Sequence, residues 1–582
     1  MSKTDIHQIE SSIWDMANKL RNSMDASDYK NYILAFMFYR FLSEKQAKYV
    51  VAEEIVDVKP GENPAFAVMR EIFKTDDLTK MKEYADASRG FSIFYREKRN
   101  NKDQIIYGAN GKTVTEPVGP WVEQYELYLR NVADFLGYCI PPLYDWKVLQ
   151  VMTQEQGIQA SDYQAMFDAF NASLKYNKSA ETNFEGIFSD VNLGDSRLGT
   201  TVVERAKALG RIVDQVDGIM YVDDEGKDIL GRIYEYLIKQ FAATAGKKGG
   251  EFYTPHSVSS LMAKIVTDGR EKSNKTFYVF DPTCGSGSLL LTVGKTLPGG
   301  ARPGAISYYG QEKNTTTYNL ARMNLMMNNV GYSYMHLRNA DTLGSDWPDG
   351  VGPDGKDHMR VFDAVVANPP YSAHWEASDN YLKDPRFRDY GGKLAPKTKA
   401  DYAFLLDGLY HLRQDGTMAI VLPHGVLFRG AAEAPIRTSL VENNLIDTII
   451  GLPANLFYGT GIPTVVMVLK RNKTSKDILF IDASNEFKKA KNMNELTDEN
   501  IEKIFKTYQE RKDVERYAHL ASIKEIRDND YNLNIPRYVD TSEEEPEIDL
   551  KEVEHQLNEV EKEIEKLQEV INKQLRELGV IE

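Results

Sequence analysis

The sequence predicts an α/β protein built on a mostly parallel sheet, with a helical region before it and a coiled-coil helix after it. Three patterns lead to this fold class. Helical periodicity marks the start of the chain, short β-rich runs alternate with helix-length stretches from about residue 228, and a heptad repeat occupies the end. Because 582 residues exceed the size of one domain, we divide the chain into residues 1–165, 166–485, 486–540 and 541–582.

The amino-terminal region, residues 1–165, carries two clear helical segments. In the first, apolar side chains recur every three or four residues, at Ile6, Ile9, Ile13, Met16, Leu20 and Met24. The second, residues 29–42, holds six aromatic residues and is apolar on nearly all sides, so we expect it to be buried. Residues from about 50 to 185 show no motif to which a role can be assigned.

The central region, residues 166–485, alternates helices with strands. Helical segments are expected at 228–243 and 257–267. The β-rich runs are 277–280, 306–310, 361–367, 417–422, 446–452, 464–469 and 478–481. This alternation predicts a parallel sheet with helices on both faces, and ligands at the carboxyl ends of its strands. Residues 486–540, which follow, look helical and charged.

The last segment, residues 541–582, predicts a coiled coil. Eight of its nine seam positions are apolar, with Glu and Lys around them. The seam is Leu550, Val553, Leu557, Val560, Ile564, Leu567, Ile571, Gln574 and Leu578. A helix of this type needs a partner, whether within the chain, in a second copy or in another protein.

Composition excludes several classes of protein. No stretch approaches the length of a membrane span and the start lacks an apolar signal region, so we expect no membrane partner. The two cysteines, Cys139 and Cys284, cannot make a disulfide framework, which indicates a reducing, cytoplasmic setting. The nine histidines show no metal-ligand spacing, so we expect no metal.

A glycine-rich turn follows the run 277–280. Its residues include Asp281, Gly285, Ser286, Gly287 and Ser288. Between a strand and a helix, such a turn brings the backbone close to a nucleoside ligand. Glu312 lies 25 residues past Gly287 at the tip of the next strand, where ribose hydroxyls are bound, and Asp341 follows the third element, placed to read an adenine amino group. No Walker A sequence is present, which disfavours phosphate transfer.

The run 361–367 ends at the tetrapeptide Asn368-Pro369-Pro370-Tyr371. The Asn368 amide and the Pro369 carbonyl both accept hydrogen bonds from an NH2 group, the two prolines fix the backbone direction, and Tyr371 offers a flat face. These features suit the alkylation of a planar nitrogen whose lone pair is delocalised. Taken alone, the tetrapeptide is also compatible with a simple turn at the end of a strand.

Charge is unevenly placed along the chain. The net charge is −15, of which residues 541–582, with 14 acidic and 5 basic side chains, contribute −9, so the remaining 540 residues hold −6. Such a body binds nucleic acid poorly by itself. Residues 383–399 reverse the sign, with six basic and two acidic side chains beside the tetrapeptide. They form either a solvated loop or a phosphate-contacting one, for which the candidates are Arg386, Arg388, Lys393, Lys397 and Lys399.

The order of these motifs resembles the S-adenosylmethionine-dependent amino-methyltransferases that act on DNA. The glycine-rich turn followed by the tetrapeptide carries the resemblance. Upstream, residues 250–256 are similar to the family's segment at the methionine end of the cofactor, which implicates Glu251, Phe252, Tyr253, Thr254, Pro255 and His256. Downstream, 401–404 and 419–423 resemble the elements that close the pocket and form the next strand, and 457–461 resembles the one that lends a second aromatic ring.

The whole arrangement is similar to the modification subunits of type I restriction-modification systems. The resemblance implies a Rossmann-like catalytic domain that transfers a methyl group from S-adenosyl-L-methionine to N6 of adenine. Asn368 and Pro369 would hold the amino group, and Tyr371 and Phe457 would face the extruded base. Only about 60 residues separate the last strand from the coil, so a partner would read the DNA sequence. The resemblance implies a specificity subunit that docks two copies of this chain, and a restriction subunit.

Several alternatives remain. A C5-cytosine methyltransferase needs a nucleophilic cysteine after the fourth strand, and neither cysteine is there. Asparagine at the first motif position favours adenine over cytosine N4 by resemblance only. Enzymes that methylate RNA bases or protein glutamine share the tetrapeptide, and a scaffold with a degenerate pocket is a further possibility.

Overall fold

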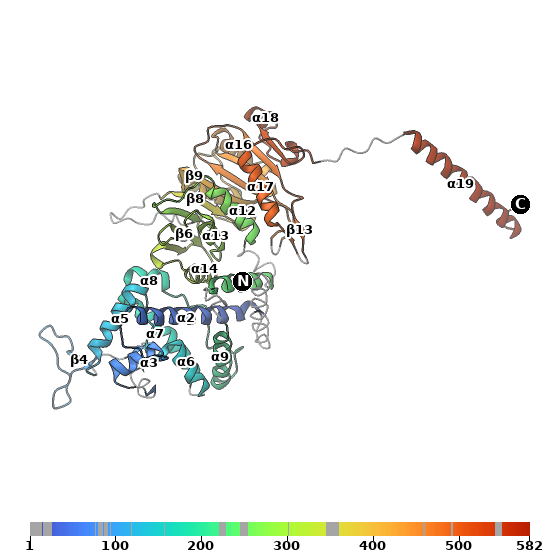
Figure 1. Ribbon diagram of the computed structural model, residues 1–582. Helices are drawn as coiled ribbons and strands as arrows, with labels where there is room; N and C mark the ends of the chain where they lie inside the picture. Colours follow the sequence, from blue (N-terminus) through green and yellow to red (C-terminus); the bar gives the residue numbers. More distant parts are fainter. Residues whose placement is uncertain are drawn as a thin grey trace.

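The computed structural model describes residues 14, 26–75, 77–78, 85–86, 91–92, 95–117, 119–155, 158–219, 229–244, 254–300, 302–344, 360–457, 460–490, 493–541 and 550–581. A bundle of helices from the first part of the chain adjoins an α/β body, and the helix α19 stands clear of both (Figure 1). Within the described ranges, no helix is long and apolar enough to cross a membrane, and no group of three or more His, Cys, Asp or Glu residues could hold a metal ion.

The helical region is wound around α2 (Ala26–Ala52). Residues 32–42 of this helix are all buried, which confirms the expected buried helix. Its aromatic rings pack against other helices. The ring centroids of Phe36 and Tyr39 each lie 5.9 Å from the ring centroid of Phe167 in α7 (Ala160–Ser173). The first expected helix, residues 6–24, lies outside the described residues except for Trp14. The other helices are α3 (Pro64–Val68), α5 (Val122–Leu136), α6 (Trp146–Gln154), α7 (Ala160–Ser173), α8 (Lys178–Phe184), α9 (Val202–Asp217) and α10 (Leu230–Thr244).

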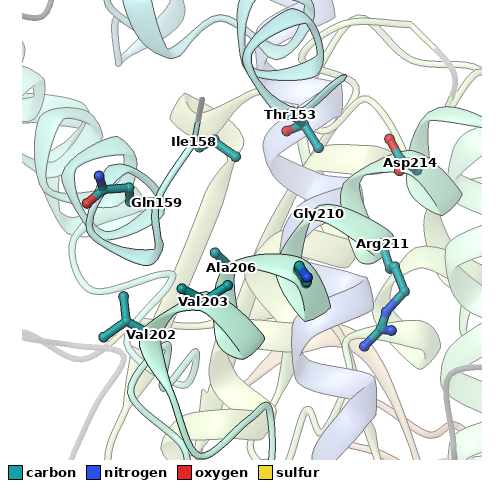
Figure 2. A pocket seen from close by; sticks show the side chains of 10 residues that line it. Thr153, Ile158, Gln159, Val202, Val203, Ala206, Gly210, Arg211 and Asp214 are labelled. Atoms are coloured by element: carbon teal, nitrogen blue, oxygen red, sulfur yellow. The ribbon is translucent and has the colours of Figure 1, made fainter. Parts of the chain in front are cut away.

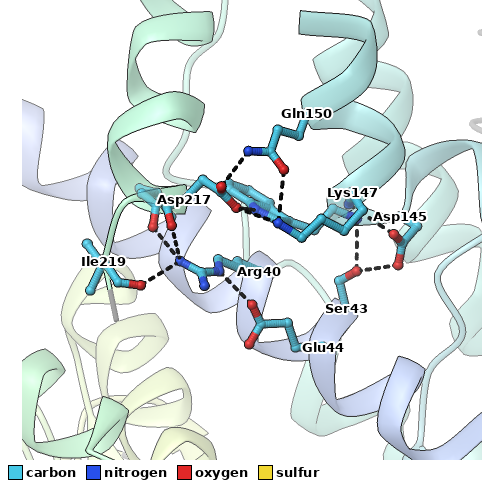
Figure 3. A network of polar contacts seen from close by, with 10 residues as sticks. Arg40, Ser43, Glu44, Asp145, Lys147, Gln150, Asp217 and Ile219 are labelled. Carbon is cyan, nitrogen blue, oxygen red and sulfur yellow. Dashed lines mark hydrogen bonds and ion pairs between the residues drawn. The ribbon is translucent and has the colours of Figure 1, made fainter. Parts of the chain in front are cut away.

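A polar network ties α2 to the end of α9 (Figure 3). The Arg40 guanidinium donates to the carbonyl oxygens of Val216 and Ile219, at 2.6 and 2.9 Å. A cation at a helix carboxyl terminus satisfies carbonyls that have no intrahelical partner and complements the helix dipole. Asp217, at the same end, accepts from Trp146 Nε1 at 2.8 Å, so α6 joins the same junction. Small two-stranded pairs, β1 (Ala85–Asp86) with β2 (Phe91–Ser92) and β3 (Tyr95–Glu97) with β4 (Thr115–Pro117), complete this region.

The α/β body contains a nine-stranded sheet in the order β15-β12-β10-β11-β9-β8-β5-β6-β7, with β15 (Ala518–Ala521) and β7 (Met335–Asn339) at its two edges. Seven of its strands were expected from sequence, and all seven are present. They are β5 (Phe277–Asp281), β6 (Ile306–Glu312), β8 (Phe362–Ala367), β9 (Leu412–Pro423), β10 (Ile446–Gly451), β11 (Thr464–Lys470) and β12 (Ile478–Asp482). Strands β7, β6, β5, β8 and β9 are parallel neighbours, whereas β11 is antiparallel to both β9 and β10. This is the predicted α/β class with a mostly parallel sheet.

Two apolar cores cover the sheet, one on each face. One core joins Val279, Ala364 and Val421 to the helices α12 (His256–Thr267) and α13 (Ser288–Thr296). The other joins Val365 and Ile420 to α15 (Asp401–Tyr410) and α16 (Glu433–Glu442). Because both faces are buried, these strands read as continuous apolar runs in the sequence. The remaining helices of the body are α14 (Thr315–Met327), α17 (Asp498–Glu510) and α18 (Ile523–Asp528).

Residues 486–540 differ from the expected helical segment. They hold α17 and α18, but also the edge strand β15 (Ala518–Ala521), which pairs with β12, and the short pair β13 (Lys488–Lys489) and β14 (Asn494–Glu495). The expected boundary between residues 165 and 166 falls within α7, and helices continue to α10. The four-part domain division itself stays a prediction.

The tail contains α19 (Leu550–Glu577). The seam side chains that the structure describes from Val553 onward are exposed, with 59% of Leu557, 49% of Ile564 and 57% of Leu567 accessible to solvent. A predicted helix is therefore present, with its apolar stripe uncovered. That this stripe pairs with a partner stays a prediction.

Candidate active site

Two turns meet at one edge of the sheet. From β5 the chain runs outward through β6 and β7 (Met335–Asn339), and then returns to place β8 on the other side of β5. The strand order therefore reverses between β5 and β8, and in open α/β sheets such a switch point is where ligands bind. The glycine-rich turn leaves the carboxyl end of β5, and the tetrapeptide at Asn368 leaves that of β8. The structure thus brings together the two motifs that the sequence identified.

The glycine-rich turn is held close to its neighbours. Gly285 and Gly287 have φ angles of +54° and +75°, in the left-handed region that favours glycine. A Cβ on Gly287 would lie 2.5 Å from Leu325 Cδ1, so the turn approaches α14 more closely than any side chain allows. Asn324 of α14 donates to the Ser286 carbonyl oxygen at 2.9 Å. Ser286 and Ser288 lie beside one another, with 3.0 Å between their hydroxyl oxygens.

Two carboxylates face this turn. Asp281 is buried, its Oδ1 accepts from the Thr283 amide at 2.9 Å, and burial raises its pKa to about 8. Glu312, at the tip of β6, accepts from the amides of Gly285 (3.2 Å) and Asn314 (2.7 Å), and burial raises its pKa too. A carboxylate offers about four lone-pair positions, so Glu312 keeps acceptors for a diol. The glycine backbone of the turn carries no side chains, and it lies next to the Glu312 carboxylate. This arrangement fits a nucleoside cofactor.

Asp341 is less enclosed. It lies beyond β7 and pairs with Lys313 Nζ at 2.7 Å, and 46% of its side chain is exposed. Its other oxygen accepts from the Leu343 amide at 3.2 Å. The residue is therefore next to the switch-point edge, one strand further out than Glu312.

The tetrapeptide is fixed by side chains from both directions. Asn368 Nδ2 donates to Thr254 Oγ1 at 3.1 Å, and the Tyr371 hydroxyl donates to Asn368 Oδ1 at 2.9 Å. Burial raises the pKa of Tyr371, so its hydroxyl stays protonated and remains a donor. The oxygen end of the Asn368 amide is thus oriented toward Tyr371. Pro369 is buried and Pro370 is exposed.

Of the upstream segment, the structure describes only the end. Glu251, Phe252 and Tyr253 lie outside the described residues. Thr254 contacts Asn368, as above, which ties this segment to the tetrapeptide directly. Pro255 is buried at the start of α12, and His256 is the first residue of that helix and is exposed.

A buried ion-pair network supports the far end of the tetrapeptide. The Ser372 amide donates to Asp401 Oδ1 at 2.9 Å, and Asp401 Oδ2 accepts from Arg429 Nη2 at 2.5 Å. Arg429 also donates to Glu433, at 2.6 Å. The sequence reading included Asp401 only within a pocket-closing segment, and missed Arg429 and Glu433. Their i,i+4 spacing was a signal for a helical ion pair, but not for its contact with a residue 28 positions upstream.

Phe457 lies against Tyr371, and the two rings are not parallel. Their centroids are 6.0 Å apart and their planes meet at 84°, in an edge-to-face contact. Phe457 is 6% exposed. A base held between these two rings therefore needs one of them to move.

The basic loop divides into buried and exposed residues. Arg386 is 2% exposed, and its guanidinium donates to Asp384, to Asp407 Oδ1 at 3.0 Å and to the Thr342 carbonyl oxygen at 2.9 Å. It has no surface to offer a phosphate, which corrects the expectation for this residue. Arg388, Lys393 and Lys397 are exposed, and Lys399 is half-buried.

Away from the switch point, a cavity lies in the helical region (Figure 2). Its volume is about 710 Å³, and it runs between α9 and the ends of α6 and α7. The lining includes Val202, Val203 and Ala206 on one side and Thr153 and Gln159 on the other. It contains none of the motif residues described above and no nucleophile paired with a base, so it does not compete as the site of the chemistry.

Comparisons with known proteins bear on the whole chain. The family model described as N-6 DNA Methylase matches residues 225–547, and one described as HsdM N-terminal domain matches 9–216. The methylase subunit of the type I restriction enzyme MpnII from Mycoplasma pneumoniae is 36% identical over 554 residues, which are 94% of this chain and 92% of that protein. The MjaVIII methylase subunit from Methanocaldococcus jannaschii is 36% identical over 359 residues, 60% of each chain.

Solved structures agree with this picture. A type I restriction-modification methyltransferase subunit from Streptococcus thermophilus superposes with a TM-score of 0.73 at 40% identity, covering 92% of this chain and all (100%) of that one. A putative type I modification subunit from Vibrio vulnificus shares the fold, with a TM-score of 0.53 at 18% identity, covering 92% of this chain and 97% of that one.

Proposed function

The chain belongs to the N-6 DNA methylase family, as a type I restriction-modification methylase subunit, and from this premise we propose that it methylates N6 of adenine in DNA. The methyl donor is S-adenosyl-L-methionine, and a partner specificity subunit selects the DNA sequence. We further propose that one specificity subunit docks two copies of this chain, and that a restriction subunit joins the complex. The observation that carries the proposal is the oriented Asn368 amide beside the glycine-rich turn at the switch point.

The cofactor would be held by the residues around the glycine-rich turn. Glu312 accepts from the ribose hydroxyls, Asp341 reads the adenine amino group, and Asp281 and the backbone at Gly285–Ser288 line the nucleoside. Residues 251–256 would contact the methionine end. When bound, S-adenosyl-L-methionine supplies an electrophilic methyl carbon on a sulfonium. The buried carboxyl of Asp281 supports this assignment, because a group with a pKa of about 8 can donate a hydrogen bond to a ligand at neutral pH.

The residues of the tetrapeptide would hold and orient the target amine. An adenine must leave the duplex before its amino group can enter a pocket of this kind. Asn368 Oδ1 carries two lone pairs, so it accepts from the amine while it also accepts from Tyr371. The Pro369 carbonyl accepts the second N–H. Two acceptors on the amine favour a more pyramidal nitrogen. Its lone pair would form the new N–C bond as the methyl carbon leaves the sulfonium sulfur, which would keep the electron pair of the broken C–S bond.

Positioning supplies much of the rate in this scheme. Stacking on Tyr371 contributes about 1–3 kcal/mol per base. Holding the nitrogen and the methyl carbon in line makes a bimolecular reaction effectively unimolecular. After transfer the nitrogen releases one proton to solvent. The scheme calls for no strong general base, because the methylated amine is strongly acidic while its nitrogen carries a positive charge.

Methylation of plasmid DNA, with and without a candidate specificity subunit, tests the proposal. We expect modification only with the partner, and only at adenine N6 when the position is mapped. An Asn368→Ala variant should lose turnover and keep cofactor binding measured by calorimetry. Robust, site-selective methylation by the chain alone would contradict the role of the partner. A folded chain that fails to bind the cofactor would instead indicate a scaffold.

A further inference from the structure

The residue that follows the tetrapeptide has an unusual backbone. Ser372 has a φ of +52°, which is uncommon for a residue with a side chain. In a β-turn over residues 369–372, the closing hydrogen bond would run from the Ser372 amide to the Pro369 carbonyl oxygen. That amide donates to Asp401 Oδ1 instead, at 2.9 Å. No described residue donates to the Pro369 carbonyl oxygen.

Asp401 is itself held rigidly. Its side chain is 0% exposed, and Arg429, whose side chain is 20% exposed, bridges it to Glu433, whose side chain is 2% exposed. An uncompensated buried carboxylate would be strongly destabilising, so the Arg429 guanidinium is what allows Asp401 to be buried as an acceptor. The network thus fixes the Asp401 carboxylate against the turn. Its other members, Arg429 in the loop before α16 and Glu433 at the start of α16, lie outside the motifs.

We propose that Asp401 is a positioning residue that keeps the methyl-transfer turn open by taking the Ser372 amide away from the Pro369 carbonyl. The carbonyl is then free to accept from the amine of the target base. This inference rests on the proposed function, because it concerns the acceptor that the amine uses. It assigns to Asp401 and Arg429 a role that differs from simply closing a pocket.

The consequence of removing Asp401 follows from local chemistry. Without its acceptor, the Ser372 amide would be released to close onto the Pro369 carbonyl, and that bond would compete with the amine of the base. Because the Pro369 carbonyl would then be shared between the Ser372 amide and the amine of the base, we expect kcat to fall roughly tenfold to a hundredfold. Cofactor binding and extrusion of the base do not use the Pro369 carbonyl, and both should persist.

The test uses the complex of this chain with its specificity subunit, carrying Asp401→Ala or Asp401→Asn. Asp407→Asn is the matched control, because Asp407 lies in the same helix, is fully buried and pairs with Arg386 at 3.0 Å. Three quantities are measured for each: the cofactor Kd, the fluorescence of 2-aminopurine placed at the target position, and single-turnover methylation of adenine. 2-Aminopurine lacks the amino group at position 6. Its fluorescence therefore measures extrusion of the base into the pocket independently of any hydrogen bond from the amine to the tetrapeptide.

We expect Asp401→Ala to bind cofactor and extrude 2-aminopurine like the unchanged complex while methylating at least tenfold more slowly. Asp401→Asn keeps one accepting oxygen and should recover part of the rate, and Asp407→Asn should methylate normally. Methylation at the unchanged rate in Asp401→Ala would overturn the inference. So would a joint loss of all three quantities, which would assign Asp401 to structure alone. If the unchanged complex itself methylates no adenine, the proposed function fails instead.

Discussion

The contact between Thr254 and Asn368 allows a sharp prediction. Thr254 Oγ1 accepts from Asn368 Nδ2 at 3.1 Å, and Tyr371 donates to Asn368 Oδ1 at 2.9 Å. Together these bonds determine which end of the amide faces which way. A Thr254→Val exchange keeps the shape of the side chain and removes the acceptor. The amide is then held from one side only and is free to turn its NH2 toward the amine, where two donors repel.

The magnitude follows from one neutral hydrogen bond. Its net contribution is about 0.5–1.5 kcal/mol, and each 1.36 kcal/mol changes a rate about tenfold, so kcat should fall about twofold to thirteenfold. Because the amide acts on the base, this loss should remain at saturating cofactor. Thr254→Ser retains the hydroxyl and should restore the rate.

The assay is single-turnover transfer of a labelled methyl group by the complex with its specificity subunit, together with the cofactor Kd from calorimetry. A higher Kd in Thr254→Val with an unchanged rate at saturation would limit Thr254 to the cofactor role expected from sequence. Equal impairment of the valine and serine variants would also refute the hydrogen-bond argument, because the hydroxyl would then be irrelevant.

Three further predictions concern the rest of the chain. Burial raises the pKa of Asp281 from 3.8 to about 8, so the stabilisation from its bound proton is fully present below pH 3.8 and is lost as pH rises through about 8. Relative to the unchanged chain, the free energy of unfolding of Asp281→Asn should therefore increase between pH 6 and 8, by at most about 1.4 kcal/mol per pH unit. Urea unfolding measures this difference. Replacing exposed Lys393 and Lys397 by Ala should reduce the slope of log K for DNA against log salt by about 0.9 per phosphate contact. Replacing Leu557 and Ile564 of α19 by Glu should abolish co-purification with the specificity subunit and leave the melting temperature unchanged, because both side chains are exposed.

Each of these has a clear contrary outcome. A stability difference that does not vary with pH would show that Asp281 is ionised in the folded chain. For the lysines, the control is an equal charge change in the exposed residues 272 and 275, before β5 at the opposite edge of the sheet, and an equal slope change there would indicate a diffuse charge effect. A lower melting temperature in the α19 variant would show that the seam packs within this chain.

The sheet was largely predictable because most of its strands are buried on both faces. Strand β8 is buried at all six positions, and such a run is visible in sequence as consecutive apolar residues. The edge strands were missed for the opposite reason. In β7 the last two residues are exposed, and in β15 the two central residues are half-buried, so neither gives a continuous apolar run or a clear alternation.

The site was predictable where its chemistry is local and not where it depends on distant pairs. The glycine-rich turn and the tetrapeptide each carry their function within a few residues. Thr254 and Asn368 are 114 positions apart, so only the fold reveals their contact. The basic loop is a second example. Arg386 is paired with Asp407, 21 residues later, and this pairing is not evident from the number of charges in residues 383–399.

These contacts together give the turn one chemical character. Pro369 and Pro370 have no amide hydrogen, the Ser372 amide is taken by Asp401, an Asn368 N–H by Thr254, and the Tyr371 hydroxyl by Asn368. These donors are thus absent or engaged, whereas the carbonyl oxygens of Asn368 and Pro369 keep lone pairs. A surface of acceptors binds an NH2 group and leaves a keto oxygen without a partner. In the proposed function, selectivity for an amino-bearing base over guanine O6 or thymine O4 would therefore depend on how these donors are engaged, and not on the tetrapeptide alone.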